Sequence, residues 1–284
     1  MTQNLADSAG HPSKTGADQE HIWRRYRSTS LPELALNEVI RGQLQHRSVR
    51  KFLNVEMSDE TLRTLVAAAQ SASSSSNMQT WSVVAIRDPK QKARLAELSN
   101  HQDFMNEAGV LLIWLIDYSR ILNHALEDEV HLPATEFLEA FMVGAVDASL
   151  AAQNATVAAE SLGLGVCYIG AARNHPDQIA EVLNLPQYVF PIFGLIVGVP
   201  DPSEKAAIRP RLAQESVLHF ETYNAETSNE ATTRYEASLN SYFEDFGRTH
   251  SWRQRNLWRL ASIELMQGRD HLVKHIESQG FTIR

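Results

Sequence analysis

The pattern of apolar and polar positions in this 284-residue chain alternates between helical and strand spacing. Leu36, Val39 and Ile40 fall on one face of a helix predicted over residues 32–45. A second predicted helix follows Ser58, whose side chain can cap the first turn, and a run of serines ends it. The remaining pattern predicts strands at 81–87, 109–117, 166–170 and 190–199, and helices at 89–99 and 176–183. Helices and strands therefore alternate through most of the chain.

A long alanine-rich segment and a polar carboxy-terminal part complete the predicted organisation. Residues 135–162 carry apolar side chains on more than one side, which is typical of a central buried helix. After a basic loop that reaches Leu212, we expect a polar linker over 224–232 and helices over 233–246 and 256–278. We therefore divide the chain into a disordered or extended tail, a core and a helical extension, at residues 1–30, 31–223 and 224–284.

The composition is that of a soluble globular protein, and it excludes several classes of partner. The net charge is -8 at pH 7, so the chain lacks the basic surface that nucleic acids and anionic membranes require. Its apolar runs fall short of the roughly 20 residues that span a bilayer, and its amino-terminal segment lacks a secretory signal, so we expect a cytoplasmic protein. The single cysteine, Cys167, excludes an intrachain disulfide, and its apolar setting favours an inert buried thiol over a catalytic one.

Three separated segments carry side chains that bind phosphate. They are residues 46–50 (HRSVR), 73–76 (SSSS) and 209–211 (RPR). Arginine presents a rigid fork of donors that matches phosphate, and histidine and serine add short donors, so a fold that gathers the three segments would bind an anionic cofactor. Two of these segments also have a simpler explanation. Arg47 and Arg50 would suit a solvated helix end, and the serines would suit a polar helix terminus.

Other catalytic and binding motifs are absent or weak. Gly163, Gly165 and Gly170 lack the strand, turn and helix order of a dinucleotide-binding fingerprint, and the chain has neither a phosphate loop nor a Gly-x-Ser-x-Gly turn. His124 and His131 lie near three consecutive carboxylates, which would suit a metal or, more simply, a solvated loop. The sequence therefore gives no anchor for a hydrolase, and we predict no metal.

The order and spacing of several stretches resemble the FMN-dependent nitroreductase superfamily, and within it the group of the oxygen-insensitive NADPH nitroreductase and flavin reductase P. The matching stretches are 46–52, 73–76 with Gln79, Gln102, 153–155, 158–165, 168–170 with 173–174, and 209–212. The resemblance implies an α+β fold with a mixed central sheet wrapped by helices. It also implies an intertwined homodimer with two FMN sites at the subunit interface, on which the carboxy-terminal helices pack.

The resemblance also implies which residues bind the cofactor. The FMN phosphate would meet His46, Arg209 and Arg211, with Ser48 on the phosphate or ribityl chain and Arg50 at the pyrimidine edge of the ring. The rest of the predicted cofactor-binding set is Arg47, Val49, Ser74, Ser76, Gln102, Tyr168, Ile169, Gly170 and Ala171. Relatives usually have lysine where Arg209 stands, a change that keeps the charge. Arg248 is the candidate for the phosphate of the nicotinamide nucleotide.

The implied activity is an FMN-dependent NAD(P)H oxidoreductase that reduces nitroaromatics, quinones or similar electrophiles in a ping-pong cycle. Hydride would pass from NADPH or NADH to flavin N5, so we nominate no catalytic residue of the protein itself. A fixed guanidinium at Arg50 would stabilise the reduced flavin. Two alternatives stay open: a flavin reductase that supplies reduced FMN to a monooxygenase, and a flavin-binding sensor or interaction module without turnover.

Overall fold

The computed structural model describes residues 16–28 and 31–284, and these form two compact units. Unit 1 consists of the described residues up to Arg47 together with Ala207–Ala261. Unit 2 consists of Ser48–Ala206 and Ser262–Arg284. The chain therefore passes between the units three times, so neither unit is a single stretch of sequence. The predicted boundaries at residues 30 and 223 follow a different division.

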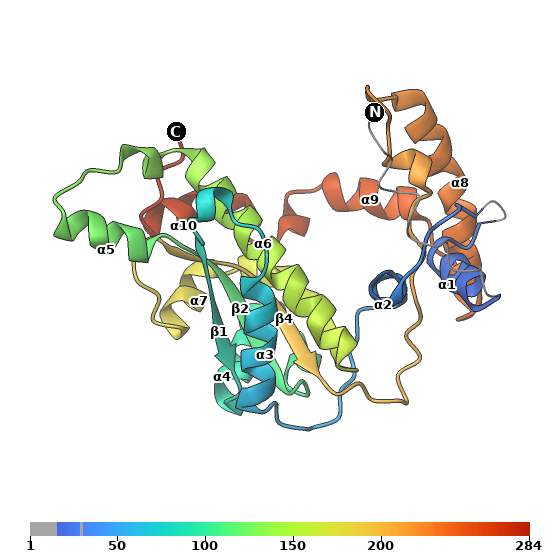
Figure 1. The fold of residues 1–284 in the computed structure, drawn as a ribbon, viewed down its shortest axis with the longest axis horizontal. Coiled ribbons are helices and arrows are strands. Elements are labelled where there is room, and N and C mark those ends of the chain that lie inside the picture. Colours follow the sequence, from blue (N-terminus) through green and yellow to red (C-terminus); the bar gives the residue numbers. More distant parts are fainter. Residues whose placement is uncertain (1–15, 29–30) are drawn as a thin grey trace, which may run out of the picture. The chain divides into compact units, whose positions relative to one another are not determined.

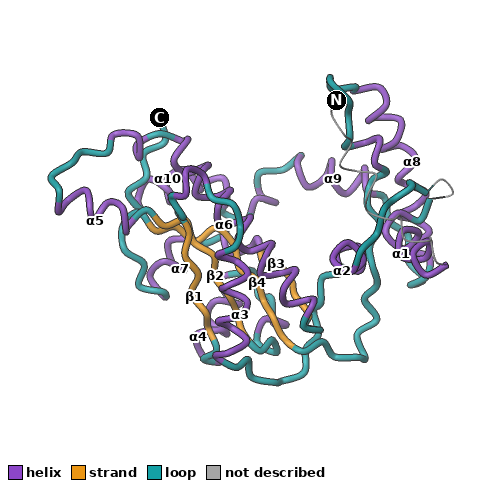
Figure 2. The backbone as a smooth tube through the Cα atoms, viewed as in Figure 1, coloured by secondary structure: helices purple, strands orange, loops and turns teal. Residues whose placement is uncertain are grey.

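Unit 2 is built on a four-stranded sheet in the order β1-β2-β4-β3. The strands are β1 (Trp81–Ile86), β2 (Val110–Asp117), β3 (Gly165–Ile169) and β4 (Val189–Gly198); Figure 1 labels β1, β2 and β4, and Figure 2 labels all of them. All three neighbouring pairs are antiparallel. The mixed sheet that the resemblance implied is therefore not found among these strands; a parallel pairing occurs as the isolated bridge between Ser48 and Val166. Every residue of β2 is buried, as its continuous apolar run predicted.

Helices cover both faces of the sheet. Alternate residues of the apolar strand β2 point to opposite sides, so both faces must be shielded from water. The covering helices are α3 (Asp59–Gln70), α4 (Pro89–Leu98), α6 (Leu138–Ser161) and α7 (Pro176–Val182). Leu111, Ile113 and Leu115 share one apolar cluster with side chains of α4 and α7. Leu112 and Trp114 share the other with side chains of α3 and α6, the two helices that cross the strands in Figure 2. The core of unit 2 is thus two apolar layers separated by the sheet.

The long helix α6 is buried on one side and exposed on the other. Its buried side consists of small residues, which allow close approach to the sheet, and at Gly144 an added Cβ would lie 2.4 Å from Cγ2 of Ile116. The opposite side exposes Leu138, Met142, Val146 and Leu150 by 42%, 52%, 54% and 44%. The helix begins later than the predicted 135–162 because Pro133–Glu136 form a 3-10 turn, η3. Central burial is therefore confirmed for one face of α6.

The other described helices and turns of unit 2 are short. They are α5 (Ser119–Glu127), α10 (Leu272–Ser278), and the 3-10 turns η1 (Ser75–Asn77), η2 (Asp103–Met105), η4 (Gly170–Arg173), η6 (Glu264–Met266) and η7 (Arg269–His271). The single helix predicted over 256–278 is wrong. The chain instead turns at Gln267 and Gly268, which have positive φ angles of 53° and 88° that break a right-handed helix.

The regular secondary structure described in unit 1 is helical. Its helices are α1 (Gly16–Tyr26), α2 (Glu38–Gln45), α8 (Ala225–Glu244) and α9 (Trp252–Leu260), and Gln214–Ser216 form the 3-10 turn η5. The predicted linker over 224–232 is wrong, because Asn224 caps α8 and Ala231 is buried. The predicted tail over 1–30 contains α1, while residues 1–15, 29 and 30 lie outside the described part. None of the described helices is long and apolar enough to cross a membrane.

Candidate functional site

The structure divides the predicted cofactor residues between the two units. Unit 1 contains His46, Arg47, Arg209, Arg211 and Arg248. Unit 2 contains Ser48, Val49, Arg50, Ser74, Ser76, Gln102, Tyr168, Ile169, Gly170 and Ala171. The basic run 46–50 therefore spans the point at which the chain leaves unit 1.

Unit 1 contains a cationic cavity of about 640 Å³. Five arginines line it: Arg209, Arg211, Arg248, Arg255 and Arg259. Aromatic rings form part of its wall, and the guanidinium of Arg209 lies 5.7 Å from the centre of the Phe243 ring. Guanidinium groups at this density suit a ligand that carries several negative charges, such as phosphate groups.

His250 belongs to the same cavity but does not add to its positive charge. Its ring stacks on Phe243, with 4.3 Å between the ring centres. Burial lowers the pKa of His250, and the positive charges of Arg255 and Arg209 lower it further. The imidazole therefore favours its neutral form and offers one donor and one acceptor to a ligand.

Two arginines of this cavity, Arg255 and Arg259, are absent from the sequence prediction. They are four residues apart on α9, so they share one face of that helix. The spacing was visible in the sequence. It gave no signal of function because Arg255 precedes the helix predicted over 256–278 and Arg259 lies near its start, where an arginine suits any solvated face.

The backbone of the Arg209-Pro210-Arg211 segment is held by tyrosines of α8. The buried hydroxyl of Tyr235 donates to the Pro210 carbonyl at 2.8 Å, and Tyr242 donates to the Ala207 carbonyl at 3.3 Å. Burial raises the pKa of Tyr235, which keeps the phenol protonated and able to donate. The loop that carries two of the predicted phosphate ligands is therefore supported from the helix behind it.

In unit 2, residues 48–50 of the basic run are fixed along β3. Ser48 pairs with Val166, and the amide of Val49 donates to the Val166 carbonyl at 2.9 Å. The buried side chain of Val49 packs where a Cβ on Gly165 would clash, at 2.8 Å from its Cγ2. The amide of Arg50 then donates to the Glu204 carboxylate at 2.8 Å. These contacts define the backbone from which the Ser48 and Arg50 side chains project.

Cys167 of β3 is a buried, protonated thiol beside this segment. It is 3% exposed, and burial raises the pKa of its thiol more than the charge of Arg50 and a hydrogen bond with Ser48 lower it. A protonated thiol is a poor nucleophile, which agrees with the inert thiol that the sequence favoured.

The carboxy-terminal end of β3 presents the stretch from Tyr168 to Ala171. The Tyr168 hydroxyl accepts from Thr156 at 3.1 Å and donates to Gln153 at 3.4 Å, and burial raises its pKa. Ile169 is buried, so only its backbone is available to a ligand. β3 ends at that residue, and Gly170 begins η4. This stretch therefore offers mainly backbone groups to a ligand.

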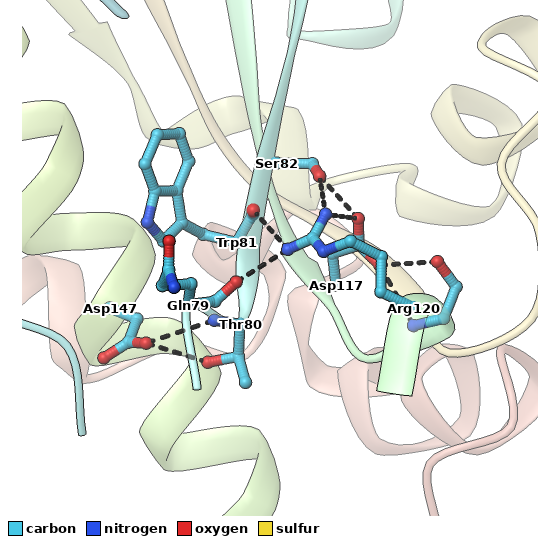
Figure 3. A network of polar contacts seen from close by, with 8 residues as sticks. Gln79, Thr80, Trp81, Ser82, Asp117, Arg120 and Asp147 are labelled. Carbon is cyan, nitrogen blue, oxygen red and sulfur yellow. Dashed lines mark hydrogen bonds and ion pairs between the residues drawn. The ribbon is translucent and has the colours of Figure 1, made fainter. Parts of the chain in front are cut away.

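The serine run forms a loop that a buried carboxylate, Asp147 of α6, holds from one side. Asp147 is 2% exposed and accepts from the Ser74 hydroxyl at 2.7 Å and the Ser75 amide at 3.1 Å. It also accepts from the amide and hydroxyl of Thr80 at 3.2 and 3.0 Å (Figure 3). The Ser74 oxygen in turn accepts from the Gln79 amide at 2.7 Å. The hydroxyl proton of Ser74 is therefore directed to Asp147.

Arg120 of α5 holds the end of the same loop from the other side. Its guanidinium donates to the carbonyls of Gln79 and Trp81 at 2.6 and 2.9 Å, and to Ser82 and Asp117 at 2.8 and 2.7 Å (Figure 3). Between the two supports, Ser76, Asn77 and Gln79 adopt positive φ angles of 49°, 56° and 52°. Such angles are unfavourable for residues other than glycine and persist only where contacts enforce them. Sequence analysis missed both Asp147 and Arg120.

Gln102 lies in a turn of unit 2 that follows α4. Its side chain donates to the Asn100 carbonyl at 3.4 Å, and Asn100 and His101 have positive φ angles of 64° and 51°. The alternative metal cluster around His124 does not form, because His124 instead meets Glu127 at 3.1 Å on the exposed side of α5. Within the described ranges no group of three or more metal-binding side chains was found.

Comparison with protein families and known proteins agrees with the architecture of this chain. The nitroreductase family model matches residues 44–102 and 98–199, and the model of the nitroreductase C-terminal domain matches 209–284. An FMN reductase (NADPH) of Bacillus subtilis is 36% identical over 251 residues, which cover 87% of this chain and 99% of that protein. An NADPH-dependent oxidoreductase of Staphylococcus epidermidis is 38% identical over 249 residues, covering 84% and 96%.

Solved structures give the same result. NfrA2 of B. megaterium has a TM-score of 0.82 at 36% identity and covers 88% of this chain and 100% of its own. The NADPH:FMN oxidoreductase of Vibrio harveyi, solved with NAD+, has a TM-score of 0.77 at 33% identity and covers 87% and 100%. The predicted α+β nitroreductase-like fold is confirmed by these similarities. The chain belongs to the nitroreductase family.

Proposed function

We propose that this chain is an FMN-dependent NAD(P)H oxidoreductase that reduces nitroaromatics, quinones or similar electrophiles by alternating two-electron transfers. The observation that carries the proposal is the cavity lined by five arginines in unit 1, in a chain of the nitroreductase family. The names of its relatives, an NADPH-dependent FMN reductase and NADPH-dependent oxidoreductases, support the same activity and the same cofactors.

The residues present fit FMN by their chemistry. The FMN phosphate carries up to two negative charges, and Arg209 and Arg211 supply forked donors from one loop, to which we add His46 of the same unit. For the ribityl chain and ring we propose Ser48, Arg50, Ser76, Gln102 and the backbone of 168–171. We also propose Ser74, whose hydroxyl donates its proton to Asp147 and so would offer only its oxygen or backbone to the cofactor.

Bound FMN would supply the acceptor for hydride from the nicotinamide nucleotide and the donor to the second substrate. The protein would bind and orient the reactants and tune the charge around them. A guanidinium at Arg50, placed at the pyrimidine edge, would favour negative charge there and so raise the reduction potential. We assign no proton-transferring residue in the protein.

The remaining arginines of the cavity suit the nicotinamide nucleotide. Arg248 is the proposed contact of its phosphate, and Arg255 and Arg259 extend the same positive surface along α9. Because a 2'-phosphate adds charge that such a surface would bind, we expect NADPH to be preferred over NADH. No metal is proposed.

We further propose that the active form is a homodimer with FMN at the interface between subunits. The exposed apolar face of α6, with Leu138, Met142, Val146 and Leu150 each at least 42% exposed, supports a second copy as its cover. The carboxy-terminal helices would pack on the same dimer. A cytoplasmic location stays a prediction from the sequence.

Spectroscopy of the purified protein tests the proposed function. The protein should be yellow, and NADPH should bleach its flavin absorbance in the absence of oxygen. Colourless protein that cannot be reconstituted with FMN would contradict the proposal. Stopped-flow reduction by NADPH and by NADH would then establish the preferred donor.

A flavin reductase that releases reduced FMN to a monooxygenase is the second candidate, favoured by the printed name of the Bacillus subtilis relative. Steady-state turnover with free FMN and with nitrofurazone separates the two activities. Faster turnover with free FMN would favour the flavin reductase. Steady consumption of either nicotinamide would exclude the third possibility, a flavin-binding module without turnover.

A further inference from the structure

The first described helix, α1, lies outside the part of the chain that family membership explains. The family models match from residue 44 onward and leave residues 1–43 unmatched. The alignments with solved relatives include all or nearly all of each relative, but only 88% of this chain or less. Helix α1 nevertheless belongs to unit 1, where its contacts can be compared directly with the predicted phosphate ligands.

Arg25, near the end of α1, contacts the backbone of both segments that carry these ligands. Its side chain is buried, at 6% exposure for the residue. The guanidinium donates to the carbonyls of Leu44 and His46, each at 2.7 Å from Nη2, and to the Arg209 carbonyl at 3.2 Å from Nη1. The Arg25 carbonyl accepts from the Arg211 amide at 2.8 Å. One residue therefore joins His46, Arg209 and Arg211.

The position of α1 is fixed by a second contact farther from these residues. The buried carboxylate of Asp18 meets Arg41 of α2 through two bonds, of 2.7 Å to Nε and 3.3 Å to Nη2. Ile22, one turn before Arg25, is also buried, at 6% exposure. The helix is therefore anchored on unit 1 independently of Arg25, so a change at Arg25 need not release the helix.

We propose that Arg25 is a positioning residue for the FMN phosphate: by binding three carbonyls and one amide of the backbone, it sets the relative places of His46, Arg209 and Arg211. The proposal rests on the proposed function, in which these three residues hold the phosphate. Ligand groups must be held to a fraction of an ångström for tight binding, and the support of their backbone decides this. The planar guanidinium suits the role because its donors point in several fixed directions at once.

A comparison of two flavins gives the test, because riboflavin lacks the phosphate of FMN. The Kd of each flavin would be measured by fluorescence titration for the full chain and for Arg25→Gln. We expect the variant to raise the Kd for FMN about tenfold, equivalent to ~1.4 kcal/mol, and to leave the Kd for riboflavin nearly unchanged. A merely structural role would weaken both flavins alike. Circular dichroism of the apoproteins checks that folding is intact.

Two further variants sharpen the result. Arg24→Gln is the matched control on the same helix, since Arg24 pairs with Glu20 and its side chain is 53% exposed; it should not change either Kd. Arg25→Lys keeps the charge but loses the fork, and should give an intermediate Kd for FMN. If Arg25→Gln does not fold, the lysine variant decides the question.

Several outcomes would overturn the proposal. They are an unchanged Kd for FMN in the folded variant, an equal weakening of both flavins, and an equal effect of Arg24→Gln. If the unaltered chain binds neither flavin, the proposed function itself is wrong. If it binds FMN and Arg25 has no influence, only the positioning role fails.

Discussion

At the scale of single residues, Asp147 and Arg120 show how two side chains shape a loop that contains no glycine. Asp147 accepts four hydrogen bonds, from Ser74, Ser75 and Thr80, and Arg120 donates to the carbonyls on the far side. Left-handed backbone angles in a loop of serine, asparagine and glutamine are costly without such support. The shape of the loop therefore depends on charged groups that come from other elements.

We expect Asp147→Asn to destabilise this loop. The amide nitrogen of asparagine donates where the carboxylate accepts, so at least one donor of the loop loses its partner. Such a loss costs about 1–3 kcal/mol of unfolding free energy, which chemical denaturation would measure. Glu139→Gln, an exposed change on the same helix, is the control and should have little effect. Equal stability of Asp147→Asn and the unaltered protein would show that the loop does not depend on this carboxylate.

Arg211 is the residue at which the proposed phosphate contact can be tested directly. Arg211→Ala should weaken FMN binding by about 1.5–3 kcal/mol through the loss of a charge-assisted contact. Fluorescence titration with FMN measures the change. Arg234→Ala, at another exposed arginine of unit 1, should leave the affinity unaltered. An FMN affinity that survives Arg211→Ala would remove this arginine from the site.

Sequence analysis found the basic segments but not the residues that support them. Arginines at 209, 211 and 248 were visible because they lie in short motifs or in a loop. Arg25 and Asp147 gave no local signal, since Arg25 lies in the segment predicted as a disordered or extended tail and Asp147 is a single acid in an apolar helix. Their importance comes from contacts with residues that are distant in the sequence: Arg25 with Arg209, 184 residues away, and Asp147 with Ser74, 73 residues away. Such contacts depend on the fold and have no period in the sequence.

At the scale of elements, local signals predicted the starts of α3, α4 and α7, whereas the starts of α2, α8 and α9 were misplaced. Ser58 caps α3 as expected, because a cap needs only the residues that follow it, and Asp88 caps α4 in the same way. The segment 224–232 was assigned as a linker because it is polar, yet it is the first part of α8. Buried Ala231 shows that packing outweighed polarity there.

The two faces of α6 lead to a prediction about assembly. If the exposed face is covered by a second copy, Val146→Asp places a charge in an apolar interface and should convert dimers to monomers. Sedimentation velocity measures the molar mass. Leu126→Asp, at an apolar residue of α5 that is 78% exposed, is the control and should leave the mass unchanged. A dimer that persists with Val146→Asp would place the interface elsewhere.

The buried face of α6 leads to a prediction about stability. Gly144→Ala would bring a methyl group to 2.4 Å from Ile116, so the helix must move away from β2. We expect a loss of about 1–3 kcal/mol in unfolding free energy, as for other overpacked cores. Gly42→Ala, where no atom lies within 4 Å, should be neutral or stabilising. If both variants were equally stable, the close approach of α6 to the sheet would be in doubt.

At the scale of the whole molecule, the chain follows no simple order of domains. Unit 1 takes its described residues from before Ser48 and from 207–261, and unit 2 takes the rest. A division based on composition places boundaries at polar stretches. The polar stretch at 224–232 is not a boundary, because it forms the cap and first part of helix α8 in unit 1. The predicted boundaries at residues 30 and 223 stay a prediction about the dimer, in which the helical extension would pack on the core.

The chain carries one sulfhydryl, Cys167, which is buried in β3 and held in its protonated form. Maleimide reagents should therefore not react with the folded protein. A cysteine introduced at a chosen surface position would then accept a fluorophore or spin label alone, without prior removal of the natural one. Pairs of such probes, one in each unit, would report distances within the working enzyme while its cofactor chemistry proceeds.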